Sequence, residues 1–382
     1  MRRPRTASSA ALAAGALLAL TACVAPASAP SGAPGETRYA APSGSGDCSK
    51  AAPCTLATAL TRTPAGGTVE LAEGDYGDLT LRDGGGTPEA PLTVRAADGV
   101  VARFGELRSS TPVVWAGIRV EGAWFLDDGA DGSRIEGSEV DGGGIFVRAD
   151  HVEVRDSLIH NGSSLDGIQI GGASDVLIAG NTIRDFDQEV DNGRHADCIQ
   201  LFDVDDVEIR GNRISSCYNA GIIISGGGRG IVDVVIEANF VQGCVEVSDR
   251  CGGGSAAELR DPGARGLVVR NNTFLDGSVR WGSVPGNVFD RNIVGYLSEC
   301  ASVVSNTIVT EWNRKMCKRP DWLDADGNRE GAVDVVDRVG GDLHPTDADQ
   351  VRIEPVGDGQ PAPAGIDGDE LADDVAGAAN AP

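Results

Sequence analysis

The sequence predicts an all-β fold, a parallel β-helix of stacked coils, and two repeated phrases are the reason. In the first phrase, an apolar alternation of strand length is followed by a small polar anchor residue and a second apolar pair. Its clear copies span 152–159, 176–183, 207–214 and 234–241, and weaker copies centre on Ser138, Asn272, Asn292 and Asn306. The second phrase, typified by Asp-Gly-Ile-Gln-Ile, falls between these copies at 166–170, 197–201 and 220–224.

The spacing of the anchor residues favours a solenoid over a closed globule. From Ser138 onward, successive anchors lie 19, 24, 31, 27, 33, 20 and 14 residues apart, and self-similarity near this period is typical of stacked repeats. One coil cannot bury its inward side chains alone, because water lies above and below it. Stacking removes that exposure, and each inward Val, Ile, Leu or Phe contributes roughly 1.5–3 kcal/mol on burial. Each coil therefore holds at least two short strands separated by Gly, Asn and Asp corners.

The anchor residues themselves are expected to be structural. An Asn or Ser side chain at a corner that tolerates left-handed backbone can hydrogen-bond to the coils above and below it. We therefore expect a hydrogen-bonded ladder, rather than ligand contacts, from the anchors Ser157, Asn181, Asn212, Asn239 and Asn272.

The N-terminus has the pattern of an export signal. Three arginines within the first five residues precede the apolar segment 10–20, which is too short to span a membrane. The following Leu-Thr-Ala-Cys resembles a bacterial lipobox, which implies lipid attachment at Cys23; the alternative is ordinary cleavage within 25–29. Both alternatives place the protein outside the cytoplasm. We predict a signal peptide at 1–22 and a flexible Ala/Pro/Ser/Gly-rich tether at 23–37.

The overall charge limits the partners. The formal net charge is -25, and it becomes -28 (-25 minus 3) once the three leader arginines are removed. Such a surface repels nucleic acid, and no basic patch with interleaved aromatic residues offsets it. It also repels polyuronate chains unless a metal or local arginines intervene. We expect one elongated domain, a monomer, that meets the membrane only through its lipid anchor.

The nine cysteines predict disulfides. With Cys23 lipidated, an even number remains in an oxidising compartment. Proximity in sequence favours the pairs Cys48–Cys54, Cys198–Cys217, Cys244–Cys251 and Cys300–Cys317. Alternatively, Cys217 pairs with Cys244, because each lies five residues after an anchor asparagine and the two should stack on adjacent coils. Metal binding by these cysteines is not expected, since no C-x-x-C pair occurs.

The opening of the mature chain resembles secreted bacterial β-helix proteins of the pectate lyase-like superfamily. The segments that carry this resemblance are 39–48, 53–56, 66–71, 74–76 and 91–96. The resemblance implies a single-stranded right-handed parallel β-helix whose first coil is closed by a short N-terminal capping helix at about 55–62. The first coil has no neighbour, so its apolar end must be covered.

The end of the chain resembles the closing region of the same superfamily. Segments 341–345 and 365–369 carry this likeness. We therefore predict a β-helix with its N-terminal cap at 38–316, a closing segment at 317–370 and a disordered acidic tail at 371–382. The resemblance specifies the fold much more tightly than the activity.

The hexapeptide 195–200 carries most of the functional expectation. His195 follows Arg194 and precedes Asp197, and an imidazole beside a carboxylate titrates in the range useful for acid–base chemistry. The long insertions 185–194 and 242–254 fall at the same corner of successive coils and are expected to wall a cleft above this stretch. We predict His195, Asp197 and Arg194 as catalytic residues. The alternative is a solvated loop histidine held by Asp197.

Further candidates surround this stretch. Asp166 begins the second phrase on the preceding coil and is either a substrate contact or a turn former. Gln169 and Gln200 occupy equivalent places on consecutive coils, where they bind sugar hydroxyls or form a polar ladder. Tyr218 completes the predicted substrate contacts. The acidic insertion offers possible Ca²⁺ ligands at Asp185, Asp187, Glu189 and Asp191.

These residues favour an extracytoplasmic protein that binds or modifies a polysaccharide, most of all by lyase-type β-elimination at a uronic acid. That reaction needs the substrate carboxylate neutralised, by Arg194 or by Ca²⁺, and a base such as His195 near the C5 proton. Ca²⁺ would also bridge the acidic protein to an acidic glycan.

Two alternatives stay open. Asp166 and Asp197 match the acidic coils of polygalacturonase-type inverting hydrolases, but the second aspartate of that family falls at Ala196 and its histidine at Ala220. These two differences count against hydrolysis by that mechanism. The other alternative is a surface-anchored β-helix that binds glycan or protein without catalysis.

Overall fold

The computed structural model describes residues 35–353, apart from 85, 190–194, 250 and 253, together with 362–363. The predicted signal peptide, Cys23, Arg194, Asp191 and the C-terminal tail lie outside the described residues, so the predictions for them stay predictions. In the described part of the chain, no helix is long and apolar enough to cross a membrane.

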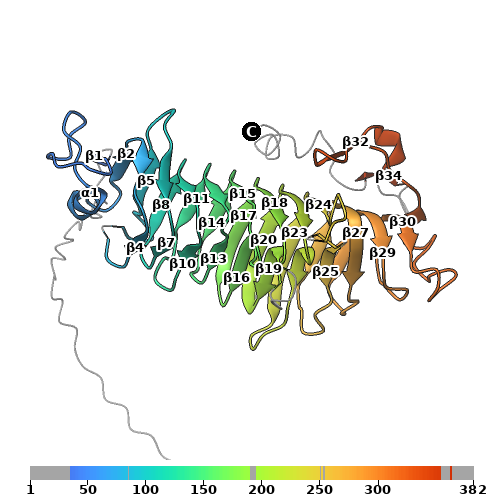
Figure 1. The fold of residues 1–382 in the computed structure, drawn as a ribbon. Coiled ribbons are helices and arrows are strands. Elements are labelled where there is room, and N and C mark those ends of the chain that lie inside the picture. The colour runs from blue at the N-terminus through green and yellow to red at the C-terminus, as the bar shows by residue number, and fades with distance from the viewer. Residues whose placement is uncertain are drawn as a thin grey trace, which may run out of the picture. The chain divides into compact units, whose positions relative to one another are not determined.

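The chain winds into a parallel β-helix with three ladders of strands (Figure 1). The first ladder is a separate sheet. Its strands, in stacking order, are β1 (Thr37–Ala40), β2 (Thr68–Leu71), β5 (Leu92–Ala96), β8 (Val113–Ala116), β11 (Arg134–Glu136), β14 (Glu153–Arg155), β17 (Ser174–Ala179), β20 (Val204–Arg210), β23 (Ile231–Glu237), β26 (Val268–Arg270) and β28 (Val288–Asp290).

The second ladder follows the first along each coil. It comprises β3 (Gly74–Asp75), β6 (Ala102–Phe104), β9 (Arg119–Val120), β12 (Glu139–Asp141), β15 (Leu158–His160), β18 (Thr182–Phe186), β21 (Arg213–Cys217), β24 (Phe240–Gln242), β27 (Thr273–Trp281), β29 (Ile293–Leu297), β30 (Ile308–Trp312) and β31 (Arg329–Glu330).

The third ladder completes each coil. It comprises β4 (Leu79–Leu81), β7 (Leu107–Ser109), β10 (Trp124–Leu126), β13 (Ile145–Val147), β16 (Ile168–Gly171), β19 (Asp197–Phe202), β22 (Ala220–Ile224) and β25 (Ser255–Leu259). It then joins the second half of β27, whose first half belongs to the second ladder. From β27 onward the two ladders therefore continue on the same strands.

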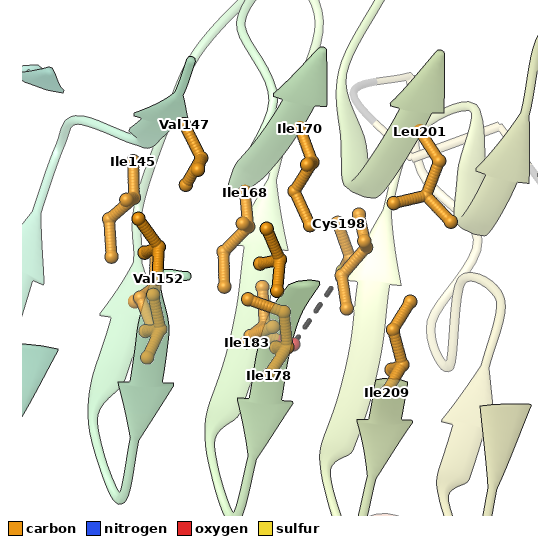
Figure 2. Close-up of a cluster of buried hydrophobic side chains, with 14 of the residues drawn as sticks. Ile145, Val147, Val152, Ile168, Ile170, Ile178, Ile183, Cys198, Leu201 and Ile209 are labelled. Atoms are coloured by element: carbon orange, nitrogen blue, oxygen red, sulfur yellow. Dashed lines mark hydrogen bonds between the residues drawn. The ribbon is translucent and has the colours of Figure 1, made fainter. Parts of the chain in front are cut away.

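The core is a set of columns of inward side chains. In the first ladder, Val154, Ile178 and Ile209 pair in register on successive coils, and each is fully buried. Figure 2 shows Ile178 and Ile209 of this column, with Ile145 and Ile168 of the third ladder directed into the same interior. Each coil thus covers the apolar side chains of its neighbour, as the alternating pattern predicts.

The anchor ladder is confirmed. The side-chain oxygen of each of Ser157, Asn181, Asn212, Asn239 and Asn272 accepts the backbone N–H of the preceding anchor. The residues just before the anchors take left-handed backbone, as at Asp156 and Ala238.

The assignment of Asn306 as an anchor is wrong. Asn292 instead donates its N–H to Thr307 Oγ1, and Thr307 donates to Asn328 Oδ1, because the last corner is shifted by one residue.

The N-terminal end of the stack is closed by a short helix, as predicted. Helix α1 (Leu56–Arg62) begins after Thr55, whose hydroxyl accepts the N–H of Thr58, and buries Leu56 and Leu60 against the first coils. At the other end, Trp322 packs edge-on against Trp312 and belongs to the main core. The parallel pairing continues past the predicted boundary at 316, to β31.

The segment after β31 packs on the side of the second ladder. Strands β32 (Val335–Asp337) and β33 (Asp342–Pro345) form an antiparallel hairpin, and Leu343 is buried with Phe240 and Leu275. The 3-10 helix η1 (Ala348–Gln350) follows, and β34 (Arg352–Ile353) pairs with β35 (Ala362–Pro363).

The disulfides take the pairing favoured by proximity. The bonds are Cys48–Cys54, Cys198–Cys217, Cys244–Cys251 and Cys300–Cys317, so the alternative Cys217–Cys244 pairing is not formed. Four disulfides are typical of proteins outside the cytoplasm.

Candidate functional site

Asp166 and Asp197 stack on each other at the corner that leads into the third ladder. Asp166 Oδ1 accepts the backbone N–H of Asp197 at 3.0 Å, and Asp197 Oδ1 accepts Asn219 Nδ2 at 2.7 Å. Asp166 is 6% exposed and Asp197 is 0% exposed, and Asp197 Oδ2 has no hydrogen-bond partner among the described residues. A carboxylate without exposed surface cannot touch a polymer.

This geometry does not support the inverting-hydrolase alternative. That mechanism needs two carboxylates on opposite sides of a sugar ring, with room for a water between one of them and the ring. Here the two carboxylates belong to one column of side chains, joined through the backbone N–H of Asp197. Asp197 instead accepts a hydrogen bond from the side chain of Asn219 and so fixes the orientation of that residue at the cavity wall.

Gln169 and Gln200 form the polar ladder that was one of the two expectations. They pair in register, and Gln169 Nε2 donates to Gln200 Oε1 at 2.9 Å and to Asp166 Oδ2 at 2.8 Å. Arg148 Nη2 donates to Gln169 Oε1. Both donors of the Gln169 amide are thereby used within the protein, so Gln200 is the better placed of the two for a ligand.

A cavity of about 350 Å³ opens beside this column. It is bounded by four consecutive coils and by the end of the second insertion, and its lining is His195, Tyr218, Asn219, Ala220, Ile223, Gly252, Gly254, Ser255, Glu258, Ser278 and Arg280. His195 is exposed and lies two residues before the start of β19, whereas Tyr218 and Asn219 lie in the turn between β21 and β22. The cavity thus brings His195 beside the end of the 242–254 insertion, whereas residues 185–189 of the other predicted wall and residues 196–200 of the predicted floor do not line it.

An ion-pair cluster forms the far side of the cavity. Glu258 of β25 pairs in register with Arg280 of β27, and Arg280 Nη1 lies 3.1 Å from Glu258 Oε2. Arg260 Nε lies 2.6 Å from Glu258 Oε1. The Glu258 carboxylate is held between two guanidinium groups, and Arg280 has further N–H groups with which to bind an anion.

The predicted metal ligands do not form a metal centre in the described part of the chain. Asp185 pairs with Arg184, and Asp187 Oδ1 accepts the hydroxyl of Ser163 at 2.7 Å. Among the described residues, three potential ligands converge at a different place, formed by Glu139, Asp141 and His160.

Even that second cluster is better explained without a metal. The guanidinium of Arg119 lies 2.5 Å from Asp141 Oδ2 and 3.4 Å from Glu139 Oε2, and His160 Nε2 lies 3.0 Å from Glu139 Oε1. A cation already neutralises the two carboxylates. Because Asp191 lies outside the described residues, the Ca²⁺ site in the acidic insertion stays a prediction.

Comparison with known proteins agrees with this architecture. The model of the family described as right-handed beta helix region matches residues 116–309. The chain belongs to this family. A search by sequence among curated proteins finds no match.

Solved structures of similar fold include several lyases. Pectate lyase Pel9A superposes with a TM-score of 0.50 at 17% identity, over 80% of this chain and 84% of that one. A rhamnogalacturonan lyase has a TM-score of 0.45 at 11% identity, over 79% and 90% of the two chains. An alginate lyase from Paenibacillus sp. has a TM-score of 0.38 at 18% identity, over 78% and 98%. At these identities the likeness shows the fold alone.

Sequence reasoning missed Glu258 and Arg280 in this right-handed β-helix. The stretch 255–259, Ser-Ala-Ala-Glu-Leu, is a further copy of the second phrase, in register with 220–224. It was hidden because the insertion before it changes the coil length and because Ser and Glu replace Asp and Gln. Aligning β25 with β19 through β22 would have placed Glu258 in the same column as Gln200 and next to Ile223.

The buried pair predicts a pH dependence of stability. Burial raises the pKa of Asp197 to about 7, against the lowering effect of Asn219 and with further raising by Asp166, whose own pKa burial also raises. The folded state therefore binds this proton more tightly than the unfolded chain. The resulting stabilisation is complete below about pH 4 and is lost as the pH rises through about 7.

Asp197→Asn tests this assignment, because it keeps the shape of the side chain and removes the ionisation. We expect the free energy of unfolding of the wild type, relative to the variant, to fall by about 1 kcal/mol for each pH unit between pH 4 and 7. Urea unfolding at a series of pH values measures it. A difference that stays constant with pH would show that Asp197 does not titrate in this range.

Proposed function

We propose that the protein binds a uronic-acid-containing polysaccharide in the His195 cavity and cleaves it by β-elimination. One observation carries the proposal: a single cavity presents an exposed imidazole and a tyrosine on neighbouring coils, with an arginine held by a carboxylate two coils further along the stack. These are the three kinds of group that the reaction needs, a base, a proton donor and a partner for the substrate carboxylate.

The proposed step moves one proton off the sugar and one onto the leaving oxygen. His195 takes the C5 proton, the C4–O bond breaks, and a C4=C5 double bond forms. Tyr218 gives a proton to the departing oxygen, so that one product has an unsaturated uronide end and the other a free hydroxyl. Arg280 pairs with the C6 carboxylate, which makes the C5 proton more acidic. Arg194, expected from sequence in that role, lies outside the described residues.

The net charge of the protein opposes the binding of a polyuronate, and the cavity has to offset this repulsion locally. The chain carries a net charge of -25, which repels a polyuronate at long range. At the cavity, Arg280 is the guanidinium that lines the wall; it shares Glu258 with Arg260, which also pairs with Glu299, so Arg280 keeps N–H groups for the substrate carboxylate. Asp166, Asp197 and Asn219 are positioning residues in this scheme.

Export and lipid attachment at Cys23 belong to the same proposal, and the mass of the mature N-terminal peptide tests them.

A product screen tests the proposal. The purified protein is incubated with a panel of uronic and neutral polysaccharides, and reducing ends and the absorbance of unsaturated uronides are followed. We expect both signals with at least one uronic polymer. Reducing ends without the absorbance would indicate hydrolysis instead. Binding without either signal would indicate the non-catalytic glycan-binding alternative.

A further inference from the structure

A second cavity adjoins the first and shares a wall with it. Its volume is about 660 Å³, and Ser278 lines both cavities. Ser278 Oγ lies 3.2 Å from Ser255 Oγ on the side of the first cavity. Toward the second cavity, Ser278 pairs in register with Tyr296, and Tyr296 pairs with Glu311. The two cavities therefore follow one another along the stack.

The row Ser278, Tyr296, Glu311 leads from one cavity into the other. Side chains in register on successive parallel strands point the same way and lie about 4.8 Å apart along the stack. A bulge between Phe274 and Ser278 shifts the register just before this row begins, and such bulges re-aim side chains. The row thus forms the floor of a continuous groove in which an extended polymer meets one new side chain per coil.

The wall of the second cavity is held in place by specific bonds. Residues 332–335 and Arg338 line it from the segment after β31. Arg338 Nε lies 2.9 and 3.0 Å from the two carboxylate oxygens of Asp276, and Gln242 Nε2 donates to the Arg338 carbonyl at 2.8 Å. The cavity is therefore bounded on one side by the β-helix and on the other by a tethered segment.

The two cavities differ in charge. The first is lined by one carboxylate, Glu258, and one guanidinium, Arg280, which pair with each other. The second contains the carboxylates of Asp276, Glu311 and Asp334 against one arginine, Arg338, which already pairs with Asp276. A sugar carboxylate is repelled there, whereas an uncharged sugar can pack against Tyr296 and donate its hydroxyls to Glu311.

We propose that the second cavity binds the sugar next to the uronate on the same polymer, and that this sugar carries no carboxylate. The inference rests on the proposed function in placing the uronate in the first cavity. It names the substrate class as a heteropolymer in which uronic acid alternates with an uncharged sugar, rather than a polyuronate.

Calorimetry with two tetrasaccharides tests the inference apart from catalysis. One probe alternates uronic acid with N-acetylhexosamine, and the other contains uronic acid alone. At equal ionic strength we expect the alternating probe to bind about tenfold more tightly. Tyr296→Ala should weaken its binding by about tenfold, because the packing surface is lost. Glu311→Gln should reduce the preference by improving the binding of the all-uronate probe.

Glu73→Gln is the matched control, since Glu73 is exposed in the turn before β3 and far along the chain from the groove. It should leave both affinities unchanged. Equal binding of the two probes, no binding of either, or wild-type binding by Tyr296→Ala and Glu311→Gln would overturn the inference. Failure of the proposed cleavage would appear separately, as binding with this preference but without unsaturated product.

Discussion

His195→Ala is expected to lower the turnover of the uronic polymer by about 10²–10⁴-fold, the usual contribution of a positioned general base. His195 is exposed and lines the cavity, so its removal creates no core cavity. The midpoint of urea unfolding should therefore stay within experimental error of the wild type. The initial rate of unsaturated-uronide formation, measured at saturating polymer, gives the turnover.

A second exposed histidine supplies the control. His151 lies away from the His195 cavity and pairs with Asp175 at 2.6 Å. Its φ of 58° favours asparagine over alanine as the replacement, so the control is His151→Asn, with His195→Asn as its exact counterpart. His151→Asn should keep full activity. Full activity in His195→Ala or His195→Asn would remove His195 as the base.

Asn212→Ala is expected to be strongly destabilising, because it removes one anchor from the middle of the ladder. Asn212 is 1% exposed; its Nδ2 donates to Ile178 O at 2.9 Å and to Asn239 Oδ1 at 3.0 Å, and its Oδ1 accepts from Asn181. Each buried polar group left without a partner costs about 1–3 kcal/mol, so the total loss should be about 3–5 kcal/mol. Urea unfolding at constant pH measures it.

Ser215→Ala on the same coil is the control for that loss. Ser215 is half-buried in β21 and lies outside the ladder, so its replacement should change stability by less than about 0.5 kcal/mol. If Asn212→Ala costs no more than Ser215→Ala, the anchor side chains do not stabilise the stack as described.

Most of the fold was predictable because each coil repeats the same two requirements, apolar side chains facing inward and a hydrogen-bonding side chain at one corner. An inward column such as Val154, Ile178 and Ile209 requires alternation, and a corner ladder requires an amide or hydroxyl at one fixed place. Both patterns are visible in one sequence. The prediction failed at Asn306, where a short coil offers two adjacent polar residues. There the backbone geometry, rather than residue type, selects Thr307 as the anchor.

The site was predictable only in part, because the polar pattern does not show which carboxylates face the solvent. Asp197 begins a strand in the same phrase as Asp166, and both are stacked inside the corner. His195, two residues before Asp197, reaches the cavity. Glu258 and Arg280 become neighbours only through pairing of β25 with β27 after irregular insertions, which no fixed period reveals.

The central claim is that the protein cleaves its polymer by β-elimination, and it is tested most directly by asking whether oxygen from water enters the products. The wild-type protein cleaves its uronic polymer in heavy-oxygen water, and mass spectrometry reads the new chain ends. β-Elimination at the His195 cavity adds no water, so the account predicts unsaturated ends without heavy oxygen. Products that carry heavy oxygen at the new reducing end and lack the unsaturated uronide would contradict it.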